Sequence, residues 1–232
     1  MNYLEPLFWL ALLKIIWINV LLSGDNAVVI AMACRSLPDK MRRTGMILGA
    51  GVAVGMRIVF TAIIAVLLGL PWLRIVGSLA LMYIAVDLVV PEAEGEEGGV
   101  AAHDSLWRAV GTIAVADLVM SLDNVVAIAA VANGDWTLII IGLVISIPMI
   151  IAGAALIMGL LSRFPFLVWA GAALLGWVAG EMFVSDVKVL DYFGEAMVHH
   201  YEYAAAAAGA VIVLAIGWAM TRLRRGAHET HA

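Results

Sequence analysis

The sequence predicts an all-α membrane protein with seven transmembrane helices, arranged as an inverted repeat of three plus three helices followed by one extra C-terminal helix. Three observations support this fold class. Of the 232 residues, 64% are hydrophobic and 13% are charged, whereas soluble domains are about half apolar. The apolar residues gather in runs of membrane-crossing length, which is about 20 residues per helix. Two of these runs contain matching tetrapeptides, SGDN at 23–26 and SLDN at 121–124.

Each apolar run is expected to be helical, because backbone polar groups in lipid must be satisfied within their own segment. The expected spans are residues 7–33, 44–70, 72–90, 107–132, 136–161, 166–184 and 203–221. The single cysteine, Cys34, excludes an internal disulfide and a cage of several thiolates around a metal.

Positive charges outside the expected spans are unequally divided between the two membrane faces. One face has only Arg74 and Lys188, with Lys14 of the first span able to snorkel to it, and the other has nine basic residues: Arg35, Lys40, Arg42, Arg43, Arg108, Arg163, Arg222, Arg224 and Arg225. Basic loops are normally cytoplasmic. The sequence therefore predicts a multi-pass protein of the cell membrane with its N-terminus outside and its C-terminus in the cytoplasm.

The internal repeat extends beyond the two tetrapeptides. When they are aligned, Asn19 falls on Asp117, and further along Gly49 falls on Gly142. Three helices per copy is an odd number, so the two copies cross the membrane in opposite senses. The predicted divisions are residues 1–90 as the first repeat, 91–106 as an acidic cytoplasmic linker, 107–184 as the second, inverted repeat, 185–202 as an outer loop, and 203–232 as the seventh helix with a basic cytoplasmic tail.

Acidic residues inside the spans point to a binding site. A charged side chain at the bilayer centre costs about 3 kcal/mol on insertion scales, so it normally faces a partner, a cavity or an ion. The candidate metal ligands are Asn19, Asp25, Asn26, Asp117, Asp123 and Asn124. All are oxygen donors, which favour hard cations such as Mn²⁺, Mg²⁺ or Ca²⁺. The structural alternative is that the asparagines hydrogen-bond neighbouring helices.

Further polar residues are candidates for gating or charge balance. Ser23 and Ser121 share helix faces with the candidate ligands, and each has the alternative of a simple interhelical hydrogen bond. Arg57 either offsets the excess negative charge of three aspartates or forms a structural ion pair with Asp87 or Asp117. In the repeat alignment Asp87 falls on Glu181, and we expect these two residues at the inner and outer mouths of the site.

The first motif allows two local structures. Asp25 lies about 100° around a helix from the stripe that carries Asn19 and Asn26. Either the polar stripe is wide, or the helix is locally unwound at the motif, where Gly24 permits a break.

The two motif regions resemble a known family. The runs INVLLSGDNAVVIAMACRSLP and IAVADLVMSLDNVVAIAAVANG are similar to the TerC family of integral membrane proteins, in its YjbE-like branch, and the likeness extends from the first span through the sixth. The resemblance implies manganese export and the supply of metal to exported proteins, and the family takes its name from tellurium resistance. It implies acidic motif residues at Asp25, Asp117 and Asp123 and motif asparagines at Asn26 and Asn124. Asn19 departs from the pattern, where an aspartate is expected.

Three functions follow as hypotheses. The first is a transporter that exports a divalent metal ion, Mn²⁺ before Ca²⁺ or Mg²⁺, by alternating access around midplane Asp and Asn residues of the two repeats. The second is a partner of the secretion machinery that delivers metal through the outer loop. The third, an intramembrane aspartyl protease, is disfavoured because an asparagine follows each motif aspartate, so we expect no enzyme. The expected partners are a divalent ion and the lipid bilayer, a second copy of the chain and the secretion machinery are further candidates, and no nucleic acid is expected.

Overall fold

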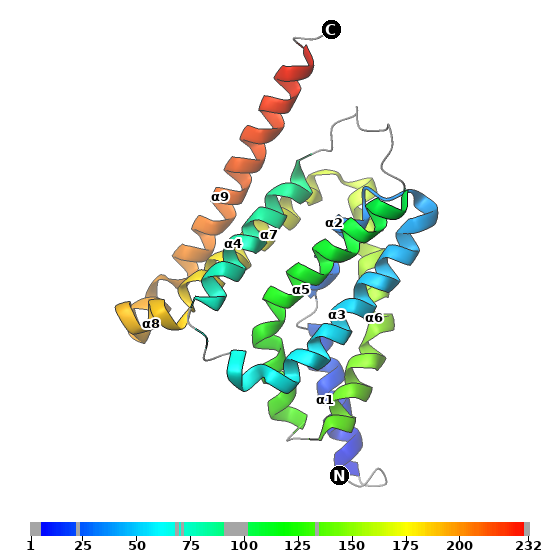
Figure 1. Ribbon diagram of the computed structural model, residues 1–232, viewed down its shortest axis with the longest axis vertical. Coiled ribbons are helices and arrows are strands. Elements are labelled where there is room, and N and C mark those ends of the chain that lie inside the picture. The colour runs from blue at the N-terminus through cyan, green and yellow to red at the C-terminus, as the bar shows by residue number, and fades with distance from the viewer. Residues whose placement is uncertain are drawn as a thin grey trace. The chain divides into compact units, whose positions relative to one another are not determined.

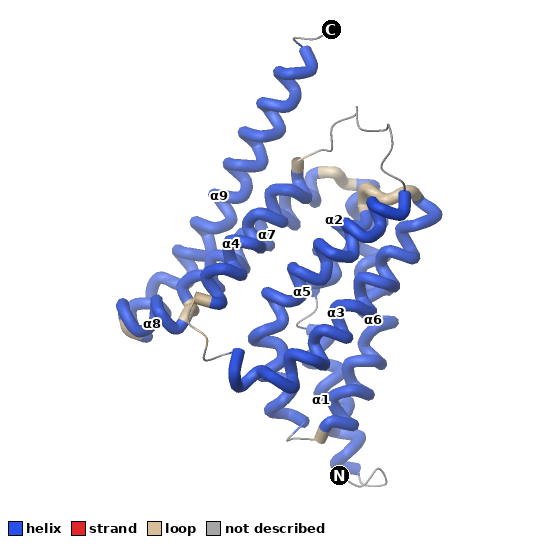
Figure 2. Tube along the Cα trace, in the orientation of Figure 1, coloured by secondary structure: helices blue, strands red, loops and turns tan. Residues whose placement is uncertain are grey.

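A computed structural model describes residues 6–21, 24–67, 70, 72–90, 102–132 and 135–229, and all regular structure in these ranges is helical (Figure 2). The helices in this part of the chain are α1 (Pro6–Leu21), α2 (Gly24–Cys34), α3 (Asp39–Leu67), α4 (Leu73–Val89), α5 (Ala102–Ala132), α6 (Trp136–Arg163), α7 (Phe166–Val184), α8 (Val187–Phe193) and α9 (Glu195–Glu229) (Figure 1).

The helices form two compact units. The first unit contains Met1–Gly69 and Leu106–Leu160, and the second contains Leu70–Ser105 and Leu161–Ala232. The first unit therefore includes α1, α2 and α3 together with most of α5 and α6, while the second includes α4, α7, α8 and α9. Each unit takes helices from both halves of the chain.

Small residues allow close helix contacts in the first unit. A Cβ atom on Gly49 of α3 would collide with the side chain of Ile113 on α5, and one on Gly142 of α6 would collide with Ile15 on α1. Glycine at these positions lets neighbouring helices approach closely enough for dispersion contacts to hold them together in lipid. These contacts bring α3 against α5 and α6 against α1.

In the second unit, α7 packs against both α4 and α9. Gly176 and Gly180 are four residues apart and so lie on one face of α7. A Cβ on Gly176 would lie 2.7 Å from the carbonyl oxygen of Gly209 on α9, and one on Gly180 would lie 2.8 Å from the Cα of Ala206. The backbones of α7 and α9 are therefore in direct contact, as in other small-residue pairs of membrane helices.

A buried aspartate joins the start of α4 to the start of α8. The carboxylate of Asp186 accepts hydrogen bonds from the backbone N–H groups of Trp72 (3.2 Å), Arg74 (3.1 Å) and Lys188 (2.9 Å). Trp72 has a φ of 69°, a left-handed conformation that is uncommon for a residue with a bulky side chain. Asp186 thus caps α8 and holds Trp72 in this conformation at the N-terminus of α4.

Most of the predicted helices are present with modest shifts of their ends. The predicted 166–184 segment coincides with α7, and the predicted 136–161 segment corresponds to α6. The first predicted span, 7–33, contains two helices, α1 and α2, and residues 22 and 23 between them lie outside the described ranges.

Helices of the structure extend into both expected connecting segments. The expected linker 91–106 and the expected outer loop 185–202 are partly helical, because α5 begins at Ala102, α8 spans Val187–Phe193 and α9 begins at Glu195 rather than at 203. Hydropathy marks the apolar part of a helix, whereas polar turns at either end continue the same backbone hydrogen bonding in contact with water. Residues 91–101 of the expected linker lie outside the described ranges.

Four helices in the described part of the chain are long and apolar enough to cross a membrane: Asp39–Ile63, Trp136–Arg163, Phe166–Val184 and Glu195–Leu223. Large apolar side chains are exposed on several helices, for example Trp17 of α1, Leu156 of α6 and Val211 of α9, each at least 64% exposed. Such surfaces are normal in lipid and unusual in water. The protein is therefore a helical, multi-pass membrane protein, and the count of seven spans stays a prediction.

The contact between α7 and α9 predicts an asymmetry between two glycine substitutions. Gly180→Ala should lower the free energy of unfolding by about 1–3 kcal/mol, because the new Cβ is forced into the backbone of α9. Gly51→Ala on α3 is the control, since no atom lies within 4 Å of its Cβ position and alanine favours helix over glycine. Thermal unfolding in detergent measures both variants, and equal stability of the two would contradict this account of the contact.

The role of Asp186 gives a second stability prediction. Asp186→Asn replaces one acceptor oxygen by an NH₂ group that faces backbone donors, so we expect a loss of about 2 kcal/mol of unfolding free energy. Asp191→Asn on α8 is the matched control. The Asp191 side chain is 66% exposed, and its pairing with Lys188, at a distance of 4.0 Å between Oδ2 and Nζ, is a weak surface interaction. Chemical denaturation in detergent checks both, and an unchanged midpoint for Asp186→Asn would show that the cap is dispensable.

Candidate functional site

A buried ion pair joins α3 to α5 in the first unit. Arg57 is 1% exposed and Asp117 is 3% exposed. Arg57 Nη2 donates to Asp117 Oδ1 at 2.7 Å. An arginine guanidinium keeps its positive charge at any accessible pH, so its burial requires a partner with a negative charge. Of the two partners expected for Arg57, the structure shows Asp117, while Asp87 lies in the second unit.

Ser121 closes a ring of hydrogen bonds with this pair. Arg57 Nε donates to Ser121 Oγ at 3.2 Å, and Ser121 Oγ donates to Asp117 Oδ2 at 2.9 Å. Ser121 and Asp117 are four residues apart on α5, so both side chains project from one face of the helix. As a result, each carboxylate oxygen of Asp117 accepts a hydrogen bond from a buried side chain.

Asp25 and Asn26 lie in the first turn of α2. The backbone N–H of Asn26 donates to Asp25 Oδ1 at 2.8 Å, which places a carboxylate at the positive end of the helix. Asp25 lies within electrostatic range of Arg57 and Asp117. The first motif is therefore near Arg57 on α3 and Asp117 on α5, within the same unit.

The side-chain amide of Asn26 has no hydrogen-bond partner. Asn26 is 5% exposed, and neither Oδ1 nor Nδ2 forms a hydrogen bond. A buried amide without partners costs about 1–3 kcal/mol, which is why such groups are rare and call for an explanation. An absent ligand that binds the amide oxygen is one such explanation.

Several predicted ligands cannot be placed. The side chains of Asn19 and Asp123 and the whole of Ser23 lie outside the described part of the chain. Asn124 is buried on α5 at 6% exposure. Among the side chains that the structure describes, no three of the Asp, Glu, His and Cys type are grouped closely enough to hold a metal ion.

The expected mouth residues, Asp87 and Glu181, both lie in the second unit. Asp87 is exposed on α4, and Glu181 on α7 is half-buried and accepts a hydrogen bond from Trp177 Nε1 at 2.7 Å. The sequence reasoning missed the contact with Trp177, although the spacing of four residues on one helix is a signal for it. The role of Asp87 and Glu181 at a pathway stays a prediction.

The segment 185–202 lines a small cavity of about 310 Å³ beside α8 and α9. His199 Nδ1 lies 3.2 Å from Glu202 Oε2 at its wall, and the other lining residues are Val184, Ser185, Leu190, Glu195 and Val198. The side chain of His199 is 87% exposed. Asp186, in the same segment, accepts hydrogen bonds from backbone N–H groups and caps α8.

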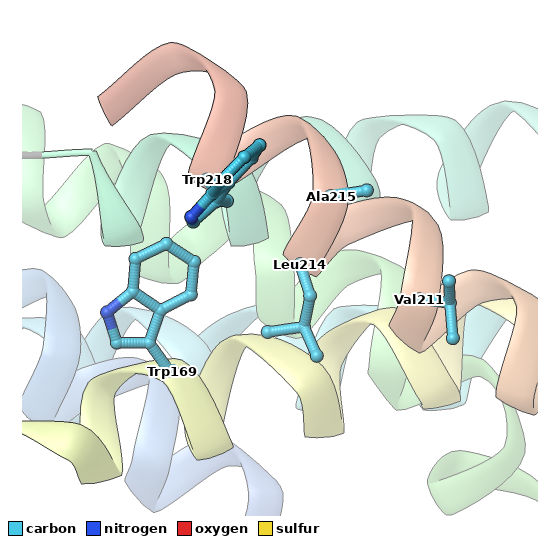
Figure 3. A pocket seen from close by; sticks show the side chains of 5 residues that line it. All are labelled: Trp169, Val211, Leu214, Ala215 and Trp218. Carbon is cyan, nitrogen blue, oxygen red and sulfur yellow. The ribbon is translucent and has the colours of Figure 1, made fainter. Parts of the chain in front are cut away.

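An apolar groove of about 480 Å³ runs between α7 and α9 (Figure 3). Trp169 and Trp218 approach each other at one end of it, and Val211, Leu214 and Ala215 continue its wall along α9 (Figure 3). The Arg222 guanidinium stacks over the Trp218 ring at 4.3 Å. The side chains that line the groove offer no oxygen donor, so it is unsuited to a hard cation.

These features define a class: a multi-pass helical membrane protein with a charged and hydrogen-bonded cluster inside one of its helical units. The chain belongs to the TerC family of integral membrane proteins, whose sequence pattern matches residues 4–226. The family that the two motifs suggested is therefore confirmed over nearly the whole chain.

Relatives with known sequences agree with this assignment. The chain is 44% identical to the uncharacterized membrane protein YjbE of Bacillus subtilis over 186 residues, which cover 80% of this chain and 84% of YjbE. It is 27% identical to the uncharacterized membrane protein YceF of the same organism, covering 77% and 72% of the two chains. It is 25% identical to the inner membrane protein YoaE of Escherichia coli, covering 56% and 29%. No solved structure matches the chain.

The buried pair predicts a strong coupling between two substitutions. Arg57→Gln and Asp117→Asn should each lower the free energy of unfolding by about 3–5 kcal/mol, because each leaves one buried charge without its partner. The double variant should lose much less, since two neutral amides replace the pair. A double-mutant cycle by chemical denaturation in detergent measures this coupling. Additive losses would show that the two side chains do not depend on each other.

Proposed function

We propose that this protein transports a divalent metal ion across the cell membrane, with Mn²⁺ as the exported substrate and the polar cluster of the first unit as its binding site. The observation that carries the proposal is the buried Asn26 amide without partners, adjacent in sequence to the carboxylate of Asp25. A cation bound by the Asp25 carboxylate and the Asn26 carbonyl oxygen would supply the missing interaction.

The donor set supports a hard cation. Asp25 and Asn26 offer a carboxylate and an amide oxygen, and the second motif offers Asn124 and Asp123 by sequence. Six or more such oxygens are the usual environment of Ca²⁺, Mg²⁺ and Mn²⁺. The choice of Mn²⁺ rests on the resemblance of the two motifs to a family implicated in manganese export. Ca²⁺ and Mg²⁺ are the competing substrates for any assay.

The proposed mechanism is alternating access between two inverted repeats. The composition of the two units supports an internal duplication, because corresponding helices of the two halves share a unit: α3 lies with α6 and α2 with α5 in the first unit, and α4 packs on α7 in the second. We place the C-terminus in the cytoplasm, on the side with the greater number of basic residues.

A transporter fits the cluster better than an intramembrane protease does. Aspartyl proteases need two carboxylates that share a proton, whereas Asp117 is paired with the Arg57 guanidinium and with Ser121. Metal delivery to the secretion machinery would use the same ion site, and the outer segment 185–202 is the surface at which to test it.

Asn26→Leu tests the proposal sharply. The substitution replaces a buried amide that has no hydrogen bond by an apolar group of similar size, so the free energy of unfolding should stay the same or rise. Mn²⁺ affinity should fall by about tenfold or more, equivalent to about 1.4 kcal/mol of binding free energy, and Mn²⁺ flux into proteoliposomes should fall with it. Asp25→Asn should abolish the flux.

Ser78→Ala is the control, because Ser78 is a fully buried hydroxyl of the second unit that bonds only to the Ile75 carbonyl of its own helix. Its flux should match that of the unmodified protein. Unchanged Mn²⁺ binding and flux in both Asn26→Leu and Asp25→Asn would reject the proposed site, and absence of Mn²⁺, Ca²⁺ and Mg²⁺ flux in the unmodified protein would reject the proposed function.

A further inference from the structure

Given the proposed transport function, we propose that Asp117 is not a ligand of the transported ion. Instead it is the permanent partner of Arg57 and acts as a positioning residue, whereas Asp25 and Asn26 supply oxygen atoms to the ion. The inference rests on the ring of contacts among Arg57, Asp117 and Ser121 and on the contrast between that ring and Asn26.

The ring leaves Asp117 fully engaged. Oδ1 accepts from the Arg57 guanidinium at 2.7 Å and Oδ2 accepts from the Ser121 hydroxyl at 2.9 Å, while Ser121 itself accepts from Arg57 Nε at 3.2 Å. Both charged side chains are at least 97% buried. A divalent cation placed on this carboxylate would lie beside a guanidinium that is shielded from water and cannot lose its proton, and like charges repel strongly in such surroundings.

The side-chain oxygen atoms of the first motif are less engaged than those of Asp117. Asn26 is 95% buried, and its side-chain amide makes no hydrogen bond. The Asp25 carboxylate accepts one hydrogen bond, from the backbone N–H of Asn26 at the N-terminus of α2. Oxygen atoms available to an ion are therefore found at Asp25 and Asn26, whereas those of Asp117 are already bound within the protein. The two candidate carboxylates of this cluster have different roles.

Mn²⁺ binding to the purified full chain in detergent, measured by titration calorimetry, tests the inference with a set of charge variants. Asp117→Asn should weaken binding by about tenfold or more, because the guanidinium is then uncompensated near the site. The double variant Arg57→Gln/Asp117→Asn should bind Mn²⁺ within about twofold of the unmodified protein, which is the usual error of additivity. The double variant keeps the net charge of the unmodified protein, and it replaces the ion pair by two neutral amides that can hydrogen-bond to each other.

The double variant Arg57→Gln/Asp25→Asn is the matched control. It makes the same change in charge but removes a proposed ligand, so its binding should stay weak. If Arg57→Gln/Asp117→Asn also stays weak while the unmodified protein binds Mn²⁺, Asp117 is a ligand and the inference is wrong, although the proposed function stands. If Mn²⁺ binding recovers in both double variants, the effect is one of net charge alone, and the inference is also wrong. If Asp117→Asn alone does not fold, Arg57→Gln/Asp117→Asn compared with the unmodified protein still decides the question, because neither of these leaves one member of the buried pair charged without the other.

Discussion

The first unit depends on the buried ion pair between Arg57 and Asp117. Arg57 is among the largest fully buried side chains in the described structure, and Asp117 and Ser121 on the facing helix help to compensate its buried guanidinium. The pair fixes the rotation and depth of α3 against α5, because a shift of either helix by one residue would separate the charges. The contact between Gly49 and Ile113 lies on the same two helices and allows them to come close. Packing and charge pairing thus specify one arrangement.

The second unit is organised by different forces. Its helices meet through glycine and alanine, with the backbone of α7 directly against that of α9, and a carboxylate at Asp186 gathers three backbone N–H groups at the ends of α4 and α8. Ser78 and Asp186 are the buried polar side chains found in the described part of this unit, and both bond only to backbone groups. Among the described residues, the hydrogen bonds between fully buried polar side chains are those of the first unit.

Hydropathy predicted the apolar helices well, because almost every residue of a helix that spans the hydrocarbon core must be apolar. It located α7 at residues 166–184 and the start of α6 at Trp136. It failed at the start of α9, because residues Glu195 to Glu202 extend the helix beyond its apolar part and hydropathy does not detect such a polar extension.

The sequence left Arg57 with two possible partners, since the registers of α3 and α5 depend on tertiary contacts. Asp186 shows the same limit, because its three donors come from segments more than a hundred residues apart and from its own turn. The lack of partners around the Asn26 amide was not predictable at all, since it depends on what every neighbouring helix does not provide.

The unbonded amide of Asn26 has a consequence for the lifetime of the protein. A buried side-chain amide without hydrogen bonds lowers the free energy of unfolding. A ligand that bonds to this amide only in the folded state shifts the folding equilibrium toward that state by mass action. If that ligand is the ion itself, metal supply and resistance to proteolysis rise and fall together. Ligand binding and resistance to proteolysis would then be linked through the folded state of the chain itself.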